Sequence, residues 1–401
     1  MAEFPIDKAL IKRTARDARE ALTLPADAYT SADVFEWEKK HFFEKGWVCL
    51  GRSSELANAG DQKAVPVGRG SVLIVRGKDG VLRGFHNTCR HRGHEVAYCS
   101  NEVMNKKALQ CPYHSWTYDL EGKFKMAPDF KDHSGFDPSD PANDLVPVWV
   151  DEWGGWVFAN MSGEATDLRS YLGNLADLCA PWEPERLVWG AGHEYVIKAN
   201  WKIATENYHE CYHCSNIHPE LCQVTPPESG EGYEPTGAWV GGSMVLMDFA
   251  ETMSLDGKSF GVPFRGLNEK QRREVYYFGL FPNLLISLHP DYVMTHRMQP
   301  LSPSETWVEC NWLFPPEALE RSDFSPTYAS EFWDITNMED WHACESVQRS
   351  VGSPGYRQGP FAPMEDDVWQ FATMVARGYL AGGVSGPVGL AKDSPYPVAA
   401  Q

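Results

Sequence analysis

Apolar residues follow a helical spacing in the first 45 residues of the chain. Between Ser31 and Lys45 a capping-type start at Thr30 precedes apolar side chains that share one broad face, which predicts a helix. Gly46 is a residue type that commonly ends a helix. We therefore expect residues 1–45 to be a helical segment that packs on a larger domain.

From residue 46 to about residue 160 the pattern changes to short alternating runs between turn residues, which is typical of strands. Five such runs are residues 71–76, 81–85, 116–124, 146–150 and 155–158. The first two are separated by Lys78-Asp79-Gly80, which predicts a β-hairpin. These residues are expected to form a small all-β domain spanning 46–160.

The rest of the chain, residues 161–401, mixes both kinds of pattern. Helical spacing covers residues 167–179, 201–212, 324–351 and 366–380, and strand-like runs cover residues 275–298 and 305–313. The segment after Gly382 is rich in turn residues and is expected to be irregular. Because strands and helices are segregated along this part, it predicts a second, larger domain of the α+β class.

Composition and charge exclude several classes of function. The chain has 36 Lys+Arg and 55 Asp+Glu, a formal charge of −19, which does not suit binding to nucleic acid or to an anionic membrane surface. No apolar run approaches the ~20 residues of a membrane-spanning helix. The N-terminus lacks an apolar signal-peptide core, so we expect a cytoplasmic protein. Its 10 Cys are then expected to be metal ligands or buried thiols.

Two matched boxes in the β domain carry metal-binding side chains. Cys89 and His91 lie in Cys89-Arg90-His91-Arg92-Gly93, and Cys111 and His114 lie in Cys111-Pro112-Tyr113-His114-Ser115. Two thiolates and two imidazoles suit either tetrahedral zinc or a [2Fe–2S] centre in which two His replace two Cys on one iron. Zinc fingers use CxxC knuckles and HxxxH spacing instead, and this favours the iron–sulfur cluster.

A second group of metal-binding side chains follows in the predicted helix 201–212 and just after it. Glu210 and His213 are three residues apart and share a helix face, whereas His213 and His218 are five apart, about 140° around a helix. The two His can converge only if the helix distorts or ends between them, and Pro219 supplies a reason for it to end.

Two His and one carboxylate form the facial triad of non-haem Fe(II) oxygenases. Asp334, Glu339 and Asp340 are candidates for that carboxylate, and spacing alone leaves the choice open. The nearby Cys211, Cys214 and Cys222 are expected to be small apolar fillers, a zinc knuckle being the alternative. His209 lies one residue from the ligand face and is expected to be a core or surface residue, and Glu206 is given no role.

The combination CxH…CxxH followed by NWK…ENYxExYHxxxxH resembles the signature of Rieske-type non-haem iron oxygenase α subunits, the ring-hydroxylating dioxygenase family, from about Trp47 to Val375. The resemblance implies that Cys89, His91, Cys111 and His114 hold the [2Fe–2S] cluster and that His213, His218 and Asp340 hold the mononuclear iron. Asp340 is chosen because the segment 337–349 resembles the family's Asn-x-x-Asp…Val-Gln-Arg context, and Glu339 is the weaker alternative.

The resemblance also implies how such a protein works. A catalytic domain of helix-grip type would carry an antiparallel sheet flanked by helices. NAD(P)H-derived electrons would arrive through a separate flavin/iron–sulfur reductase and cross to the Fe(II) of the neighbouring subunit in a homotrimer. Glu210, where many members have Asp, would bridge to a cluster His of that neighbour and serve as the catalytic residue. The substrate would be a small molecule oxygenated with O₂.

Three functions are compatible with these features. The segment Glu210-Cys211-Tyr212-His213-Cys214 resembles members that act on quaternary ammonium compounds, which implies N-demethylation or hydroxylation of a betaine-like compound with formaldehyde release. Trp239, Tyr292 and Trp312 are cage candidates with a core role as the alternative.

The second function is hydroxylation or dihydroxylation of an aromatic carboxylate, with Arg265 or Arg297 as its anchor. The third, a Rieske ferredoxin-type electron carrier, needs only the β domain and leaves the other ~240 residues unexplained.

Overall fold

The computed structural model describes residues 4–100, 102–130, 135–392, 394 and 398–399, and the chain forms two compact units. One unit is residues 38–166. The other combines residues 1–37 with residues 167–401, so its two parts are separated in sequence by the whole of the first. No helix in the described ranges is both long enough and apolar enough to span a bilayer.

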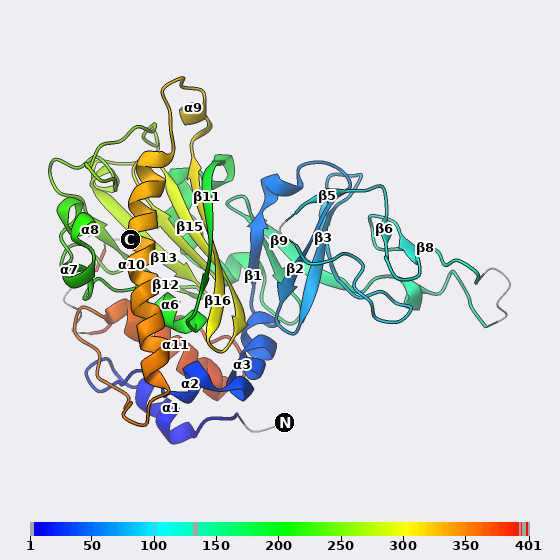
Figure 1. Cartoon of the computed structure of the whole chain (residues 1–401), viewed down its shortest axis with the longest axis horizontal. Coiled ribbons are helices and arrows are strands. Elements are labelled where there is room, and N and C mark those ends of the chain that lie inside the picture. Colours follow the sequence, from blue (N-terminus) through cyan, green and yellow to red (C-terminus); the bar gives the residue numbers. More distant parts are fainter. Residues whose placement is uncertain (1–3, 101, 131–134, 393, 395–397, 400–401) are drawn as a thin grey trace. The chain divides into compact units, whose positions relative to one another are not determined.

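The unit of residues 38–166 is built of strands (Figure 1). They are β1 (Val48–Arg52), β2 (Asp61–Val67), β3 (Gly70–Arg76), β4 (Leu82–His86), β5 (Met104–Asn105), β6 (Leu109–Gln110), β7 (Thr117–Tyr118), β8 (Phe124–Met126), β9 (Pro147–Trp153) and β10 (Trp156–Asn160). Within the described residues they pair antiparallel in one sheet of order β1-β10-β9-β4-β3-β2-β5 and a small sheet of order β6-β7-β8. The predicted all-β domain is therefore confirmed.

The predicted hairpin is the β3–β4 pair, in which Val72 faces His86 and Arg76 faces Leu82. Gly80 has a φ of +78°, which a residue without a Cβ adopts at little cost. The strand–turn–strand prediction for residues 116–124 is also confirmed, as β7 and β8, although β8 begins only at Phe124.

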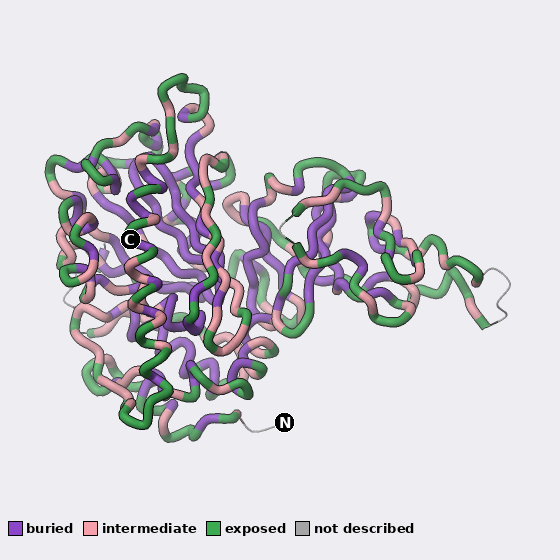
Figure 2. The backbone as a smooth tube through the Cα atoms, in the orientation of Figure 1, coloured by how far each residue is buried: buried purple, intermediate pink, exposed green. Residues whose placement is uncertain are grey.

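The second unit contains one larger sheet. Its strands are β11 (Val188–Ile197), β12 (Trp239–Val245), β13 (Glu274–Leu280), β14 (Leu284–Leu288), β15 (Val293–Ser302) and β16 (Glu305–Phe314). In the described part of the chain they form an antiparallel sheet of order β11-β16-β15-β14-β13-β12. Figure 2 shows burial concentrated along its strands, and β14 is buried over its full length. This confirms the predicted strand regions 275–298 and 305–313, but β11 and β12 were not expected.

The described part of the chain also contains helices. They are α1 (Lys8–Thr14), α2 (Asp27–Thr30), α3 (Ala32–Glu38), α4 (Leu168–Leu172), α5 (Leu175–Cys179), α6 (Trp201–Tyr208), α7 (Cys214–Ile217), α8 (Pro219–Val224), α9 (Pro316–Leu319), α10 (Thr327–Val351) and α11 (Asp366–Ala381). Figure 1 shows α10 running across one face of the sheet, and it contacts both α6 and β11. The N-terminal α1 packs on α11.

Helix ends differ from the predictions in two informative places. The predicted helix 167–179 is divided into α4 and α5 by Gly173, whose φ is +55° and whose absent Cβ would lie 2.5 Å from the backbone nitrogen of Gly237. The predicted helix 31–45 is confirmed as α3, which continues as a π-helical turn over Lys39–Phe43.

Candidate functional site

The chain leaves the helix just before the metal-binding side chains. The predicted helix 201–212 ends at Tyr208, so the expectation that Glu210 and His213 share a helix face is wrong, and both lie in the turn that follows. The expected break between the two His is confirmed. The four-residue α7 separates them, and His218 adopts φ −118° and ψ 70° directly before Pro219.

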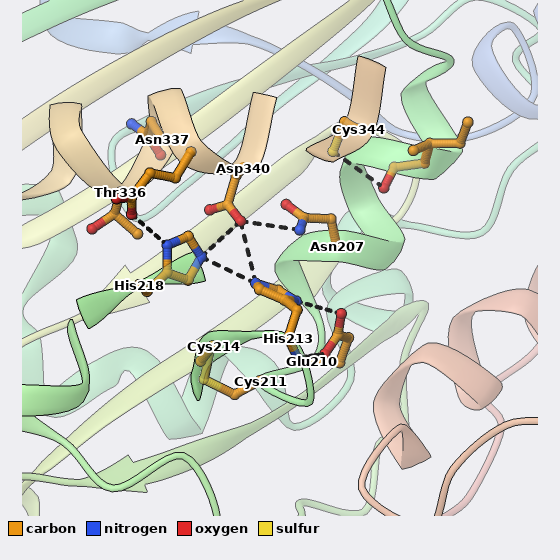
Figure 3. Close-up of polar contacts among 12 residues, drawn as sticks. Asn207, Glu210, Cys211, His213, Cys214, His218, Thr336, Asn337, Asp340 and Cys344 are labelled. Atoms are coloured by element: carbon orange, nitrogen blue, oxygen red, sulfur yellow. Dashed lines mark hydrogen bonds and ion pairs between the residues drawn. A yellow bond between two sulfur atoms is a disulfide. The ribbon is translucent and has the colours of Figure 1, made fainter. Parts of the chain in front are cut away.

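Three ligand-type atoms converge in the space next to this turn (Figure 3). Asp340 Oδ1 on α10 lies 2.9 Å from His218 Nε2 and 3.3 Å from His213 Nε2, and the two Nε2 atoms are 3.1 Å apart. Separations of ~3 Å are those of ligands at right angles around an ion ~2.1 Å from each. The donor set and its spacing therefore fit a facially coordinated divalent iron.

Each of the two His rings is oriented by a carboxylate that contacts its outer nitrogen, Nδ1. Glu210 contacts His213 Nδ1 and accepts a hydrogen bond from the His213 backbone nitrogen at 3.1 Å. Glu339 Oε2 lies 2.7 Å from His218 Nδ1. A carboxylate accepts hydrogen bonds, so both rings carry a proton on Nδ1 and turn Nε2 inward, as metal-binding His do.

Asn207, at the end of α6, completes this arrangement by donating a hydrogen bond of 3.0 Å to Asp340 Oδ1 (Figure 3). Of the three carboxylates that the sequence left open, Asp340 faces both rings and Glu339 reaches only the outer nitrogen of His218. Asp334 contacts Tyr195 and lies outside this group.

The charges of the three groups are strongly coupled. Burial alone lowers the pKa of His213, but its hydrogen bonds with Asp340 and Glu210 raise it to about 10. Burial raises the pKa of Asp340, but hydrogen bonds from His213 and His218 lower it to about 2. The ionised Asp340 carboxylate needs a neighbouring positive charge. A divalent cation supplies that charge once the imidazoles lose a proton.

A cavity extends from these residues between α6, α10 and the sheet. Tyr208, Tyr277 and Trp333 line it, together with His209, whose two ring nitrogens are buried without a partner among the described residues. His209 is buried, within the expected alternatives of a core or a surface position.

The aromatic and arginine residues that were candidates for binding the substrate do not line this cavity. The cage candidates Trp239, Tyr292 and Trp312 are fully buried core residues outside the lining of this cavity. Arg297 is buried and forms an ion pair with Glu309. Neither Arg297 nor Arg265 lines the cavity.

One cysteine prediction is wrong. Cys211 and Cys214 were expected to be unbonded apolar fillers, yet they are joined in a disulfide with a Cα–Cα distance of 4.9 Å. Both are buried in the core cluster, and Cys222 packs against that cluster as a free thiol. The CxxC spacing across a tight turn brings the two Cβ atoms within bonding reach. The bond therefore closes the turn that contains His213, the first His of the triad.

In the β unit, the two boxes form matched turns. The backbone nitrogen of Gly93 donates to the Cys89 carbonyl at 3.0 Å, and that of Ser115 donates to the Cys111 carbonyl, also at 3.0 Å. Both turns end in the left-handed region, with φ +74° at Gly93 and +59° at Ser115. The same backbone device thus presents a Cys–His pair in each box.

These turns place the two predicted Cys ligands beside each other and the two predicted His ligands beside each other. The Cys89 and Cys111 side chains are buried and close enough to interact, and burial raises the pKa of Cys111. The rings of His91 and His114 lie 4.7 Å apart. His91 Nδ1 is buried and has no hydrogen-bond partner among the described residues, as expected for a nitrogen that awaits a metal. Two thiols and two imidazoles in this arrangement fit a [2Fe–2S] centre.

Sequence reasoning missed the residues that support the ligands. Asn207 on α6 and Tyr118 on β7, whose hydroxyl lies 3.3 Å from Cys89 Sγ, are examples. Asn207 precedes Glu210 by three residues, and this polar residue near a helix end was a usable signal. Tyr118 had none, because its contact depends on how the two boxes fold together.

Family models match most of the chain. Residues 46–145 match the Rieske [2Fe-2S] domain, and residues 184–381 match the ring hydroxylating alpha subunit (catalytic domain). The carnitine monooxygenase oxygenase subunit of Escherichia coli is 32% identical over 361 residues, which are 89% of this chain and 91% of that protein.

Two further proteins are similar to this chain over most of its length. The glycine betaine monooxygenase oxygenase subunit of Chromohalobacter salexigens is 28% identical over 85% of this chain and 82% of that protein. Among solved structures, the quaternary ammonium Rieske monooxygenase CntA in complex with L-carnitine has a TM-score of 0.74 and 28% identity, covering 93% of this chain and 99% of that chain.

Proposed function

The chain belongs to the Rieske-type non-haem iron oxygenases, and from that premise we propose that it is a terminal oxygenase acting on a quaternary ammonium compound. The relatives named above for carnitine and glycine betaine support this substrate class. One atom of O₂ would enter an N-methyl or neighbouring C–H bond of the substrate and the other would leave as water. Oxygenation of an N-methyl group releases formaldehyde.

The proposed site residues follow from the geometry. Cys89, His91, Cys111 and His114 would hold the [2Fe–2S] cluster, and His213, His218 and Asp340 the mononuclear iron. The observation that carries the proposal is the convergence of the two Nε2 atoms and Asp340 Oδ1 within 3.3 Å of one another at the end of a cavity. The cluster supplies single electrons and the iron supplies O₂ activation when they are bound.

The protein's own residues hold and orient this chemistry. Glu210 and Glu339 fix the two imidazoles by their Nδ1 atoms, so that both Nε2 atoms keep one direction. Asn207 fixes the Asp340 carboxylate. Tyr277 and Trp333 shape the cavity and restrict water near the reacting carbon.

The remaining assignments are also proposals. The domains would be residues 1–45, 46–160 and 161–401, with electrons from NAD(P)H through a separate reductase. Electron transfer between subunits is named for CntA, and this supports a bridging role for Glu210 between the subunits of a homotrimer. We place the protein in the cytoplasm.

The proposal is tested by oxygen uptake and formaldehyde release. The cluster- and iron-loaded protein would be assayed with NADH, O₂ and a surrogate reductase against betaines, choline, carnitine and aromatic acids. Oxygen uptake coupled to one ammonium compound, with formaldehyde or a hydroxylated product in equal amount, is the expected result. Uptake coupled only to an aromatic acid would replace the proposal with ring hydroxylation.

A further inference from the structure

The cavity beside the triad is acidic. Four acidic side chains line it, and its described lining contains no Lys or Arg. Glu210 and Asp340 are engaged with the two histidines. Glu231 forms an ion pair with Lys270, which lies outside the lining. Asp367 is the remaining acid.

Asp367 has no such partner. It lies in the first turn of α11 and faces β12, where a Cβ on Gly242 would be 3.3 Å from Asp367 Oδ2. No hydrogen bond or ion pair from another described residue reaches its carboxyl group. Burial, reinforced by the charge of Asp366, raises the pKa of Asp367 to about 8. The ionised form of Asp367 therefore lacks a counter-charge among the residues that the structure describes.

We propose that Asp367 recognises the positive charge of the substrate, and that this substrate is an ammonium compound whose tail carries a hydroxyl group and no carboxylate. This rests on the function proposed above and deepens it. A quaternary nitrogen has no N–H to donate, so a protein holds it by opposite charge and by aromatic faces. Asp367 supplies the charge, and Trp333 and Tyr277 supply aromatic surface in the same cavity.

The tail is assigned from the polar groups that remain. Tyr277 Oη is buried and has no hydrogen-bond partner in the described parts of the chain. A buried hydroxyl left unpaired is costly, and a substrate hydroxyl satisfies it. A carboxylate tail meets acidic side chains and no Lys or Arg in this lining, and such like-charge contact excludes one partner in favour of another.

The test is equilibrium binding to the oxidised, cluster- and iron-loaded protein, followed by tryptophan fluorescence at a pH above the pKa of Asp367. The probes are choline, glycine betaine and dimethylbutanol, the uncharged carbon isostere of choline. We expect wild-type protein to bind choline at least about tenfold more tightly than either of the others. In Asp367→Asn the preference for choline over dimethylbutanol should fall to about twofold or less.

The matched control is Asp366→Asn, which removes the same charge one residue away from a side chain outside the lining. It should keep the choline preference. If Asp367→Asn loses the cluster absorbance, Asp367→Glu replaces it and should keep the preference over the isostere.

An unchanged preference in Asp367→Asn, its loss in Asp367→Glu, or tighter binding of glycine betaine by the wild type would overturn the inference. Oxygen uptake coupled to betaine would then leave the proposed function intact. Failure of all ammonium compounds to bind, with uptake coupled to an aromatic acid, would overturn both.

Discussion

The two candidate metal sites are built in different ways. The four cluster side chains come from two similar turns between Cys89 and Ser115, whose backbone hydrogen bonds match. The side chains of the candidate iron site come from a broken helical segment and from α10, and Asp340 follows His218 by 122 residues. A site made of local turns can be recognised from spacing, whereas a site that joins distant elements depends on the completed fold.

Removing one ligand from each site should have the largest effect. His213→Ala should lower oxygenation by more than about 100-fold, since even changes behind a ligand cost 10–100-fold, while the visible cluster spectrum stays intact. Cys111→Ser should abolish that spectrum and remove the two cluster irons, while the single iron of the other site stays near wild-type occupancy. Iron analysis and absorbance on the same samples decide, and loss of the cluster in His213→Ala would refute the independence of the two sites.

Glu210→Ala tests whether Glu210 only orients His213 or also connects the subunits. The cluster should be retained and iron affinity should fall by about tenfold, because His213 loses its orienting partner. Single-turnover product formation should fall further, since Glu210 is proposed to connect the subunits. A normal single-turnover rate with full iron would contradict that bridging role.

Neighbouring carboxylates give a finer test of the iron site. Asp340→Asn should weaken iron binding by more than about 100-fold, and Glu339→Gln by about 10-fold, because only Asp340 faces both Nε2 atoms. Iron dissociation constants from anaerobic titration measure both. Equal losses would mean that Glu339 is itself a ligand.

Carboxyl groups of the two units also differ in their pH response. Burial raises the pKa of Glu206 on α6 to about 7, although a hydrogen bond from Tyr29 acts against it. Hydrogen bonding from Asn105 lowers the pKa of Asp61 on β2. The native state therefore holds the Glu206 proton more tightly than the unfolded chain does, and ionisation destabilises the fold as pH rises from 4.5 to about 7.

Glu206→Gln should consequently match wild type near about pH 5 and exceed it by about 2–3 kcal/mol near about pH 8, at ~1.4 kcal/mol per pKa unit. Asp61→Asn should show the reverse, with a loss at neutral pH that disappears in acid. Thermal unfolding at the two pH values measures both effects. A stability difference between Glu206→Gln and wild type that is the same at both pH values would contradict the first expectation.

The smallest effect concerns the matched turns. Gly93→Ala should destabilise the β unit by about 1 kcal/mol, because an L-residue with φ +74° is strained although nothing lies within 4 Å of the new Cβ. Ser115→Gly should stabilise it by a similar amount, since Ser115 already bears that strain. Loss of cluster absorbance on heating reports both, and opposite signs are the result that the shared turn geometry requires.

Sequence patterns anticipated the parts of the molecule that depend on local chemistry. The β3–β4 hairpin, the helices α10 and α11 and the break before Pro219 follow from turn residues, helical spacing and proline geometry. Strand β11 escaped prediction because it is half-exposed and contains glycines, and its place in the sheet comes from pairing with β16. The Cys211–Cys214 disulfide was not predicted because a cytoplasmic protein was expected, in which cysteines are usually metal ligands or buried thiols.

At the candidate iron site the sequence alone pointed to His213 and His218, but spacing could not choose Asp340 among the neighbouring carboxylates. That choice requires knowing which face of α10 meets α6, and this depends on long-range packing. Asp367 was not considered for the same reason, because α11 reaches the cavity wall only in the folded chain.

Because the second unit is discontinuous in sequence, its two parts can pack together only late in synthesis. Residues 38–166 leave the ribosome as a complete unit, while residues 4–37 must wait for α11, on which α1 packs. Thr14 and Arg16 accept hydrogen bonds through their carbonyls from Thr373 and Trp369, which are synthesised more than 350 residues later. During synthesis the first unit is therefore free to fold and load its cluster before any iron site exists. A fragment that starts at residue 167 would lack the N-terminal strip that covers α11.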